Sequence, residues 1–77
     1  MKSLRNISIS DFRKILIVLG CRYIRTKGGH EAWKKESATR TIIFQTHIDP
    51  LPEMVVRNAI RDMGISREDF LKAYEEI

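Results

Sequence analysis

Residues 21–46 read CRYIRTKGGHEAWKKESATRTIIFQT, and this stretch decides the fold. Three short segments of strand character lie at 21–27, 30–36 and 40–46. The paired glycines 28–29 form a tight turn between the first two segments, and residues 37–40 form a second turn. Because both connections are short, the sequence predicts an antiparallel meander of three strands.

A helical pattern precedes this predicted sheet. The segment SISDFRKILIVLGC begins with Ser8 and Asp11 at the spacing of a capping box, and Gly20 supplies a C-terminal stop. Apolar residues recur at helical spacing at Ile9, Phe12, Leu16 and Leu19. The sequence therefore predicts one amphipathic helix before the first strand.

Two further helical patterns follow the proline-containing loop HIDPLP, which ends the sheet because proline cannot donate to a strand ladder. In PEMVVRNAIRDMG, Pro52 is predicted as the first helical residue and Gly64 as the stop. The candidates for its buried face are Met54 or Val55, Ile60 and Met63. SREDFLKAYEEI opens with a second box-like pair, Ser66 and Asp69, and predicts a short final helix.

The order helix, three strands, helix, helix predicts an α+β fold in which helices cover one face of an antiparallel sheet. At 77 residues the chain is expected to be a single domain spanning 1–77.

The one cysteine of the chain, Cys21, cannot form an internal disulfide or head a cysteine-rich metal site. The N-terminus lacks an apolar signal-peptide stretch, and no apolar run reaches membrane-spanning length. We therefore expect a cytoplasmic protein with no membrane partner.

The positive charge is concentrated in the first half of the chain. The formal net charge is +4, but residues 1–40 carry ten lysines and arginines against three acids, whereas residues 41–77 carry four against seven. Such asymmetry is typical of a protein that binds a polyanion, with nucleic acid the leading candidate, and equally of a basic surface that only aids solubility.

His30 follows the glycine pair directly and is the main candidate for chemistry. Imidazole exchanges protons near neutral pH, and glycine lets a phosphate approach the backbone closely. The basic neighbours that would hold phosphates are Arg25, Lys27, Lys34 and Lys35. A ribonuclease that uses no metal needs these groups. From the residues alone, a plain hairpin turn followed by a surface histidine is favoured over a catalytic group.

The sequence leaves two features of this strand and its surroundings open. One face carries His30, Ala32 and Lys34, and the other carries Glu31, Trp33 and Lys35. Trp33 favours burial of its own face and Ala32 favours burial of the other. His47, the second histidine, either completes an acid–base pair with His30 or only caps the following loop. Two distant histidines form no known metal-ligand spacing, so no metal site is expected.

In order and spacing, several of these features resemble the HicA toxins of bacterial toxin–antitoxin modules. The matching parts are a short helix ending in glycine, the motif KGGH at 27–30, a third strand ending in His47, and the closing GISREDFL at 64–71. The resemblance covers nearly the whole chain. It implies a double-stranded-RNA-binding-domain-like fold and a type II toxin that cleaves mRNA without a metal or other cofactor until a HicB-type antitoxin neutralises it.

The resemblance also assigns roles to particular residues. His30 matches the catalytic histidine of the family and would act as a general acid or base. The residues expected to contact RNA around it are Arg25, Lys27, Gly28, Gly29, Lys34, Lys35 and His47. The sequence departs from the family in four places: Gly29 replaces the usual serine, Glu31 replaces a frequent second histidine, Gln45-Thr46 stands where a proline usually precedes the histidine of the third strand, and Met54-Val55 replaces a glycine–threonine pair.

Two rival functions fit the same residues. A non-catalytic RNA-binding module would use the basic half to bind phosphates, and its affinity would fall steeply with salt without any cleavage. A protein-interaction domain would instead use its basic face to meet an acidic partner. A DNA-reading role is least favoured, because no segment shows a helix-turn-helix pattern with a basic recognition helix.

Overall fold

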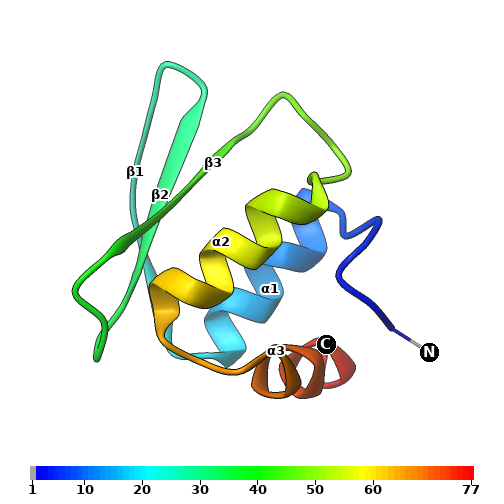
Figure 1. The fold of residues 1–77 in the computed structure, drawn as a ribbon. Coiled ribbons are helices and arrows are strands. Elements are labelled where there is room, and N and C mark those ends of the chain that lie inside the picture. Colours follow the sequence, from blue (N-terminus) through cyan, green and yellow to red (C-terminus); the bar gives the residue numbers. More distant parts are fainter. Residues whose placement is uncertain (1) are drawn as a thin grey trace.

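The computed structural model describes residues 2–77 (Figure 1). The elements, in chain order, are α1 (Ile9–Val18), β1 (Cys21–Lys27), β2 (His30–Lys35), β3 (Thr41–Gln45), α2 (Glu53–Met63) and α3 (Arg67–Glu75). This order confirms the predicted α+β layout. Among the helices of residues 2–77, none is long and apolar enough to cross a bilayer.

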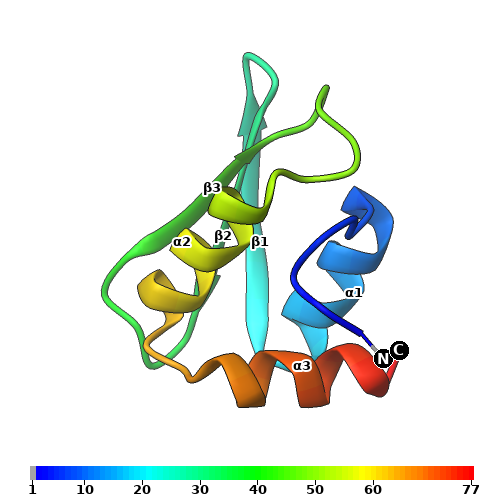
Figure 2. The same ribbon diagram turned by 45° about the vertical axis from the view of Figure 1, so that its right-hand side comes forward.

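The molecule has a sheet layer and a helix layer. The strands pair antiparallel in the order β1-β2-β3, so β2 is central and β1 and β3 are edges. Both α1 and α2 cover the same face of the sheet, and no helix formed by residues 2–77 lies on the opposite face (Figure 1). Helix α3 runs across the end of α1 and α2 and packs on α1 (Figure 2). The sheet therefore has a covered face and an open face.

The hairpin between β1 and β2 closes at the glycine pair. Lys27 pairs with His30 across it, and Gly28 and Gly29 have φ values of 58° and 79°. This left-handed backbone is readily adopted by glycine and strained for residues with a Cβ. The register between β2 and β3 places His30 opposite Gln45. His30 thus opens the central strand at the hairpin end of the sheet.

The helices begin and end close to the predicted residues. Ser8 caps α1 by accepting a hydrogen bond from the Asp11 N–H at 3.0 Å, and Ser66 and Asp69 form both arms of a capping box on α3. Gly64 ends α2 in the left-handed conformation, with φ of 69°. Pro52 is the N-cap of α2 instead of its first residue, one position outside the prediction.

The core is centred on Phe12, which is fully buried. Its ring meets Phe44 of β3 edge-on at 5.2 Å and Phe70 of α3 at 6.2 Å. One side chain of α1 therefore joins the sheet and the last helix. The other largest fully buried side chains are Ile7, Ile15, Leu16, Ile42 and Val56.

The prediction for the buried face of α2 was partly wrong. Ile60 and Met63 are buried as predicted, but Met54 is 65% exposed and Val55 is half-buried. Val56 fills the core position instead. Met54 precedes Val56 by two residues, which is about 200° of helical rotation, so the two side chains cannot face the same layer.

We expect Phe12→Ala to lower the free energy of unfolding by about 3–5 kcal/mol, because it leaves a cavity where α1, β3 and α3 meet. Equilibrium unfolding in urea measures this loss. Met54→Ala, at an exposed position, is the control and should change the free energy by less than about 0.5 kcal/mol. Equal losses in the two variants would contradict this description of the core.

Candidate nucleic-acid interface

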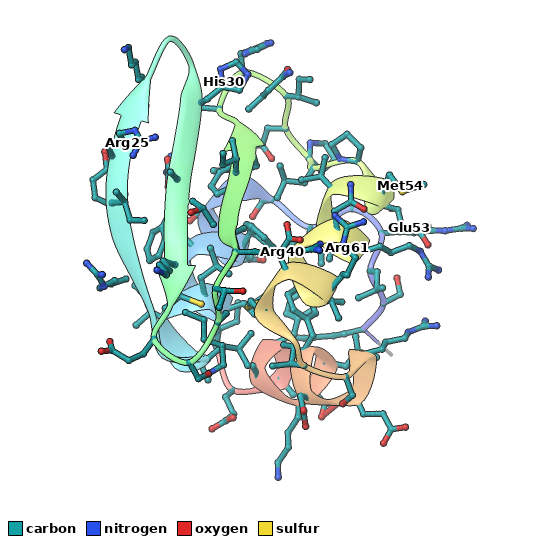
Figure 3. All side chains as sticks on the ribbon, turned by 60° about the vertical axis from the view of Figure 1, so that its left-hand side comes forward. Arg25, His30, Arg40, Glu53, Met54 and Arg61 are labelled. Carbon is teal, nitrogen blue, oxygen red and sulfur yellow. The ribbon has the colours of Figure 1, made fainter. Side chains whose placement is uncertain are left out.

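The open face of the sheet carries His30. Figure 3 shows this side chain at the end of β2, beside the loop that leads from β3 to α2. His30 is exposed, and its partners across the strands are Lys27 on β1 and Gln45 on β3. Residues paired across antiparallel strands point to the same face, so these three side chains lie together.

Four basic side chains share this open face with His30. Arg22 pairs with Lys34, Arg25 with Ala32, and Lys27 with His30. We call Arg22, Arg25, Lys27 and Lys34 the basic face. Arg22, which lies opposite Lys34, was not among the predicted site residues. A phosphate chain crossing the sheet toward His30 would meet positive charge along its path.

An irregularity in β1 places two of these residues on the basic face. The register shifts between Tyr23 and Arg25, so Tyr23 pairs with Trp33 but Arg25 already pairs with Ala32. With regular alternation, Arg25 and Lys27 would follow Tyr23 onto the covered face. The extra residue reverses the alternation and directs both cations to the open face.

Lys35 does not join the basic face. It lies in β2 on the same side as Trp33, and its Nζ donates to the carbonyl oxygen of Leu19 at 2.8 Å. Leu19 is the C-cap of α1. A cation there satisfies a free carbonyl group at the negative end of the helix. The predicted RNA contact at Lys35 is therefore separated from those at Arg25, Lys27 and Lys34.

His47 comes to the same end of the sheet as His30. The residue before it, Thr46, donates its N–H and its hydroxyl to the Gly29 carbonyl oxygen at 2.8 and 3.2 Å. A Cβ placed on Gly29 would lie 3.7 Å from Nδ1 of His47. The glycine turn and the loop after β3 are thus fastened together, with one histidine from each segment nearby.

Glu31 points from β2 into the covered face and is only 3% exposed. Arg13 of α1 binds it with two hydrogen bonds, Nη2 to Oε1 at 2.7 Å and Nε to Oε2 at 3.0 Å. The indole N–H of Trp33 also donates to Oε2 at 2.6 Å. The two bonds from Arg13 tie the start of β2 to α1 directly behind His30, a contact that sequence reasoning missed.

The contacts of Glu31 decide its charge. Burial raises the pKa of this carboxyl, but the hydrogen bonds from Arg13 and Trp33, together with the positive charge of Arg13, lower it, and the net pKa lies below its ordinary value. The same pair raises the pKa of Arg13, mainly through the hydrogen bond to Glu31. Glu31 is thus an ionised anchor at neutral pH.

One hollow beside β3 touches His30, and another lies apart from it. The first, of about 230 Å³, is lined by His30, Ile43, Phe44, Gln45, Ile48, Leu51, Pro52 and Val55. The second, of about 330 Å³, lies near the other end of β3, where Arg40 and Arg61 approach Asp62 at 3.7 and 3.3 Å. Figure 3 shows Arg40 and Arg61 well away from His30. The second hollow is separate from the histidine site.

Between residues 2 and 77, no group of three or more histidine, cysteine, aspartate or glutamate side chains is arranged to hold a metal ion.

The fold and the site together define a small α+β domain whose open sheet face presents a histidine among cations. The family model of the HicA toxin of bacterial toxin–antitoxin modules matches residues 9–65, and the chain belongs to this family. No curated protein and no solved structure matches it.

Membership gives the chain a biological role at the level of the family. The protein is a toxin of a toxin–antitoxin module, and an antitoxin is its partner. The matched range contains the glycine turn, both histidines and the whole basic face.

We expect Arg13→Met to destabilise the fold at pH 7 by about 1–3 kcal/mol, less than for a fully buried pair because the Arg13 side chain is 44% exposed. Without Arg13, its hydrogen bonds and positive charge no longer lower the pKa of Glu31, so burial raises the pKa of this carboxyl in the folded protein. In the parent protein the lowered pKa stabilises the fold above the unfolded pKa, and this contribution disappears as pH falls through the folded value.

The gap in unfolding free energy between the parent and Arg13→Met should therefore narrow from pH 7 to pH 4. Urea unfolding at both pH values measures it. Lys14→Met, at the exposed neighbouring position, provides the control and should show no such narrowing. A gap that stays constant with pH would show that the Glu31 charge does not cause the loss.

Proposed function

We propose that this toxin is a metal-independent endoribonuclease that cleaves mRNA, with His30 as its general acid–base group. The observation that carries the proposal is the position of His30. It stands exposed at the end of the basic face, and Glu31 behind it is held by three donors. A proton-exchanging side chain on a rigid strand beside phosphate-binding cations is suited to phosphodiester chemistry.

The reaction follows from groups that RNA itself supplies. The ribose 2′-oxygen attacks the adjacent phosphorus, the bond to the 5′-oxygen of the next nucleotide breaks, and a 2′,3′-cyclic phosphate remains. The 2′-OH loses a proton and the leaving 5′-oxygen gains one. His30 carries out one of these transfers, and the nearby Lys27 and Arg25 balance the charge that develops on the phosphoryl oxygens. DNA is not a substrate, because it lacks the nucleophile.

His47 is suited to the complementary transfer. It arises from the loop fastened to Gly29, so the pair of hydrogen bonds from Thr46 sets its position relative to His30. In this proposal one imidazole accepts the proton of the 2′-OH and the other protonates the leaving oxygen. A HicB-type antitoxin stops the reaction by covering His30 and the basic face, and acidic groups on its surface would accelerate association.

We expect His30→Ala to reduce cleavage of a purified mRNA by about 10²–10⁴-fold, the usual contribution of a general acid or base. Gel analysis in buffer with EDTA measures the rate, and induced cells should show growth arrest only with the parent chain. Circular dichroism checks that the variant is folded. If the two proteins cut at equal rates, His30 is not the catalyst. If the parent binds RNA without cutting it, the protein is an RNA-binding module.

The neighbouring lysines of β2 provide a matched pair that tests the basic face. We expect Lys34→Met to weaken binding to single-stranded RNA and to lower the slope of log affinity against log salt by about 0.7. Lys35→Met should leave that slope unchanged but lower the melting temperature, because it removes the contact with Leu19. Filter binding of His30→Ala versions over a salt series distinguishes them, and equal slopes would contradict the assignment of the open face to RNA.

A further inference from the structure

The hollow beside His30 has mostly apolar walls. It lies along the edge strand β3, between the loop after that strand and the first turn of α2. Three aliphatic side chains on its rim remain accessible: Ile43 is 54% exposed, Ile48 is 39% exposed, and Val55 is half-buried. His30 and Gln45 are the polar side chains in its lining. Exposed aliphatic side chains gathered around one hollow make it a candidate binding site.

The hollow is held open by contacts of its own loop. Thr46 binds the Gly29 carbonyl oxygen, Asp49 accepts a hydrogen bond from the Ile9 N–H at 3.1 Å, and the Leu51 N–H donates to the Ile7 carbonyl oxygen at 2.9 Å. Each contact joins the loop to a segment distant in sequence. The walls contributed by Ile48 and Leu51 are therefore in place before a ligand arrives, which lowers the entropic cost of binding.

The position and chemistry of the hollow fit a nucleobase. An RNA strand held by the basic face brings its scissile phosphate to His30, which also lines the hollow, so a base next to that phosphate lies within reach. A volume of about 230 Å³ suits one flat ring better than a helix or strand of a protein. Unstacked RNA bases bind between apolar side chains and are read by hydrogen bonds to their edges.

Gln45 can supply that reading. It pairs with His30 across the strands, and its amide offers both a donor and an acceptor to a base edge. The hydrogen-bonded pairing of β3 with β2 fixes the backbone of Gln45, so its amide enters the hollow from a defined position. An aliphatic pocket alone would bind bases with little preference, whereas a directed amide distinguishes them.

We propose that this hollow is a nucleobase subsite that holds the base adjoining the scissile phosphate, with Ile43 and Val55 packing on the ring and Gln45 reading its edge. The inference rests on the proposed ribonuclease function and adds a determinant of cleavage specificity to it. The toxin then cuts preferentially at phosphates beside one kind of base.

The test compares three variants with the parent chain. Val55→Trp fills the hollow, Gln45→Ala removes the amide at an exposed position, and Ile17→Trp makes the same kind of enlargement on α1, at a residue 62% exposed outside the lining. Cut sites are mapped on one mRNA, and kcat/KM is measured on short RNAs that differ only at the base beside the cut.

We expect Val55→Trp to lower kcat/KM by roughly tenfold or more, mainly through KM, and Gln45→Ala to reduce the base preference about tenfold while cutting continues. Ile17→Trp should behave as the parent. Melting temperatures show whether each variant is folded, and Gln45→Ala keeps the test valid if Val55→Trp does not fold.

A second measurement does not require cleavage. A 2-aminopurine placed beside a 2′-deoxy cut site reports by its fluorescence whether that base leaves the stack when the toxin binds, and we expect Val55→Trp to abolish this fluorescence change.

If the parent cuts RNA but both variants keep its cleavage rate, its cut sites and its fluorescence change, the subsite is overturned and the ribonuclease proposal stands. If both variants lose only antitoxin binding, the hollow belongs to the protein partner and the subsite is again overturned. If the parent cuts no RNA, both proposals fail.

Discussion

The buried carboxylate of Glu31 is the constraint on which the arrangement of the site depends. A charge at a position only 3% exposed requires hydrogen-bond donors, and Arg13 and Trp33 supply three of them. Because strand residues alternate, directing Glu31 and Trp33 to the helices directs His30 and Lys34 to the open face. One ion pair thereby connects the packing of α1 with the orientation of the candidate catalytic group.

The shift of register in β1 places further charged side chains on the open face. Regular pairing throughout would leave Arg22 on the open face and direct Arg25 and Lys27 to the covered face, under the helices. The extra residue between Tyr23 and Arg25 gathers them on the open face, where no desolvation is required. The basic face and the core thus occupy opposite sides of a sheet only one layer thick, so a small toxin carries a charged surface without weakening its interior.

The end of the sheet near His30 combines segments from three parts of the chain. The glycine turn, the loop after β3 and the residues around the start of α1 are joined by hydrogen bonds at Gly29, Asp49 and Leu51. Preorganisation of this kind suits a site that must place a phosphate and a base accurately.

Sequence alone determined the order of the elements, because capping residues, glycine stops and paired turns act locally: Ser8, Gly20, Ser66 and Gly64 all lie where their chemistry predicts. It also singled out His30 as the candidate group. Contacts formed on folding established which face of β2 is covered, that Lys35 binds a helix end, and that Met54 is exposed. They also brought the aliphatic side chains of β3, its loop and α2 together in a hollow beside His30. Those outcomes depend on contacts between residues far apart in the chain, and no local pattern encodes such contacts.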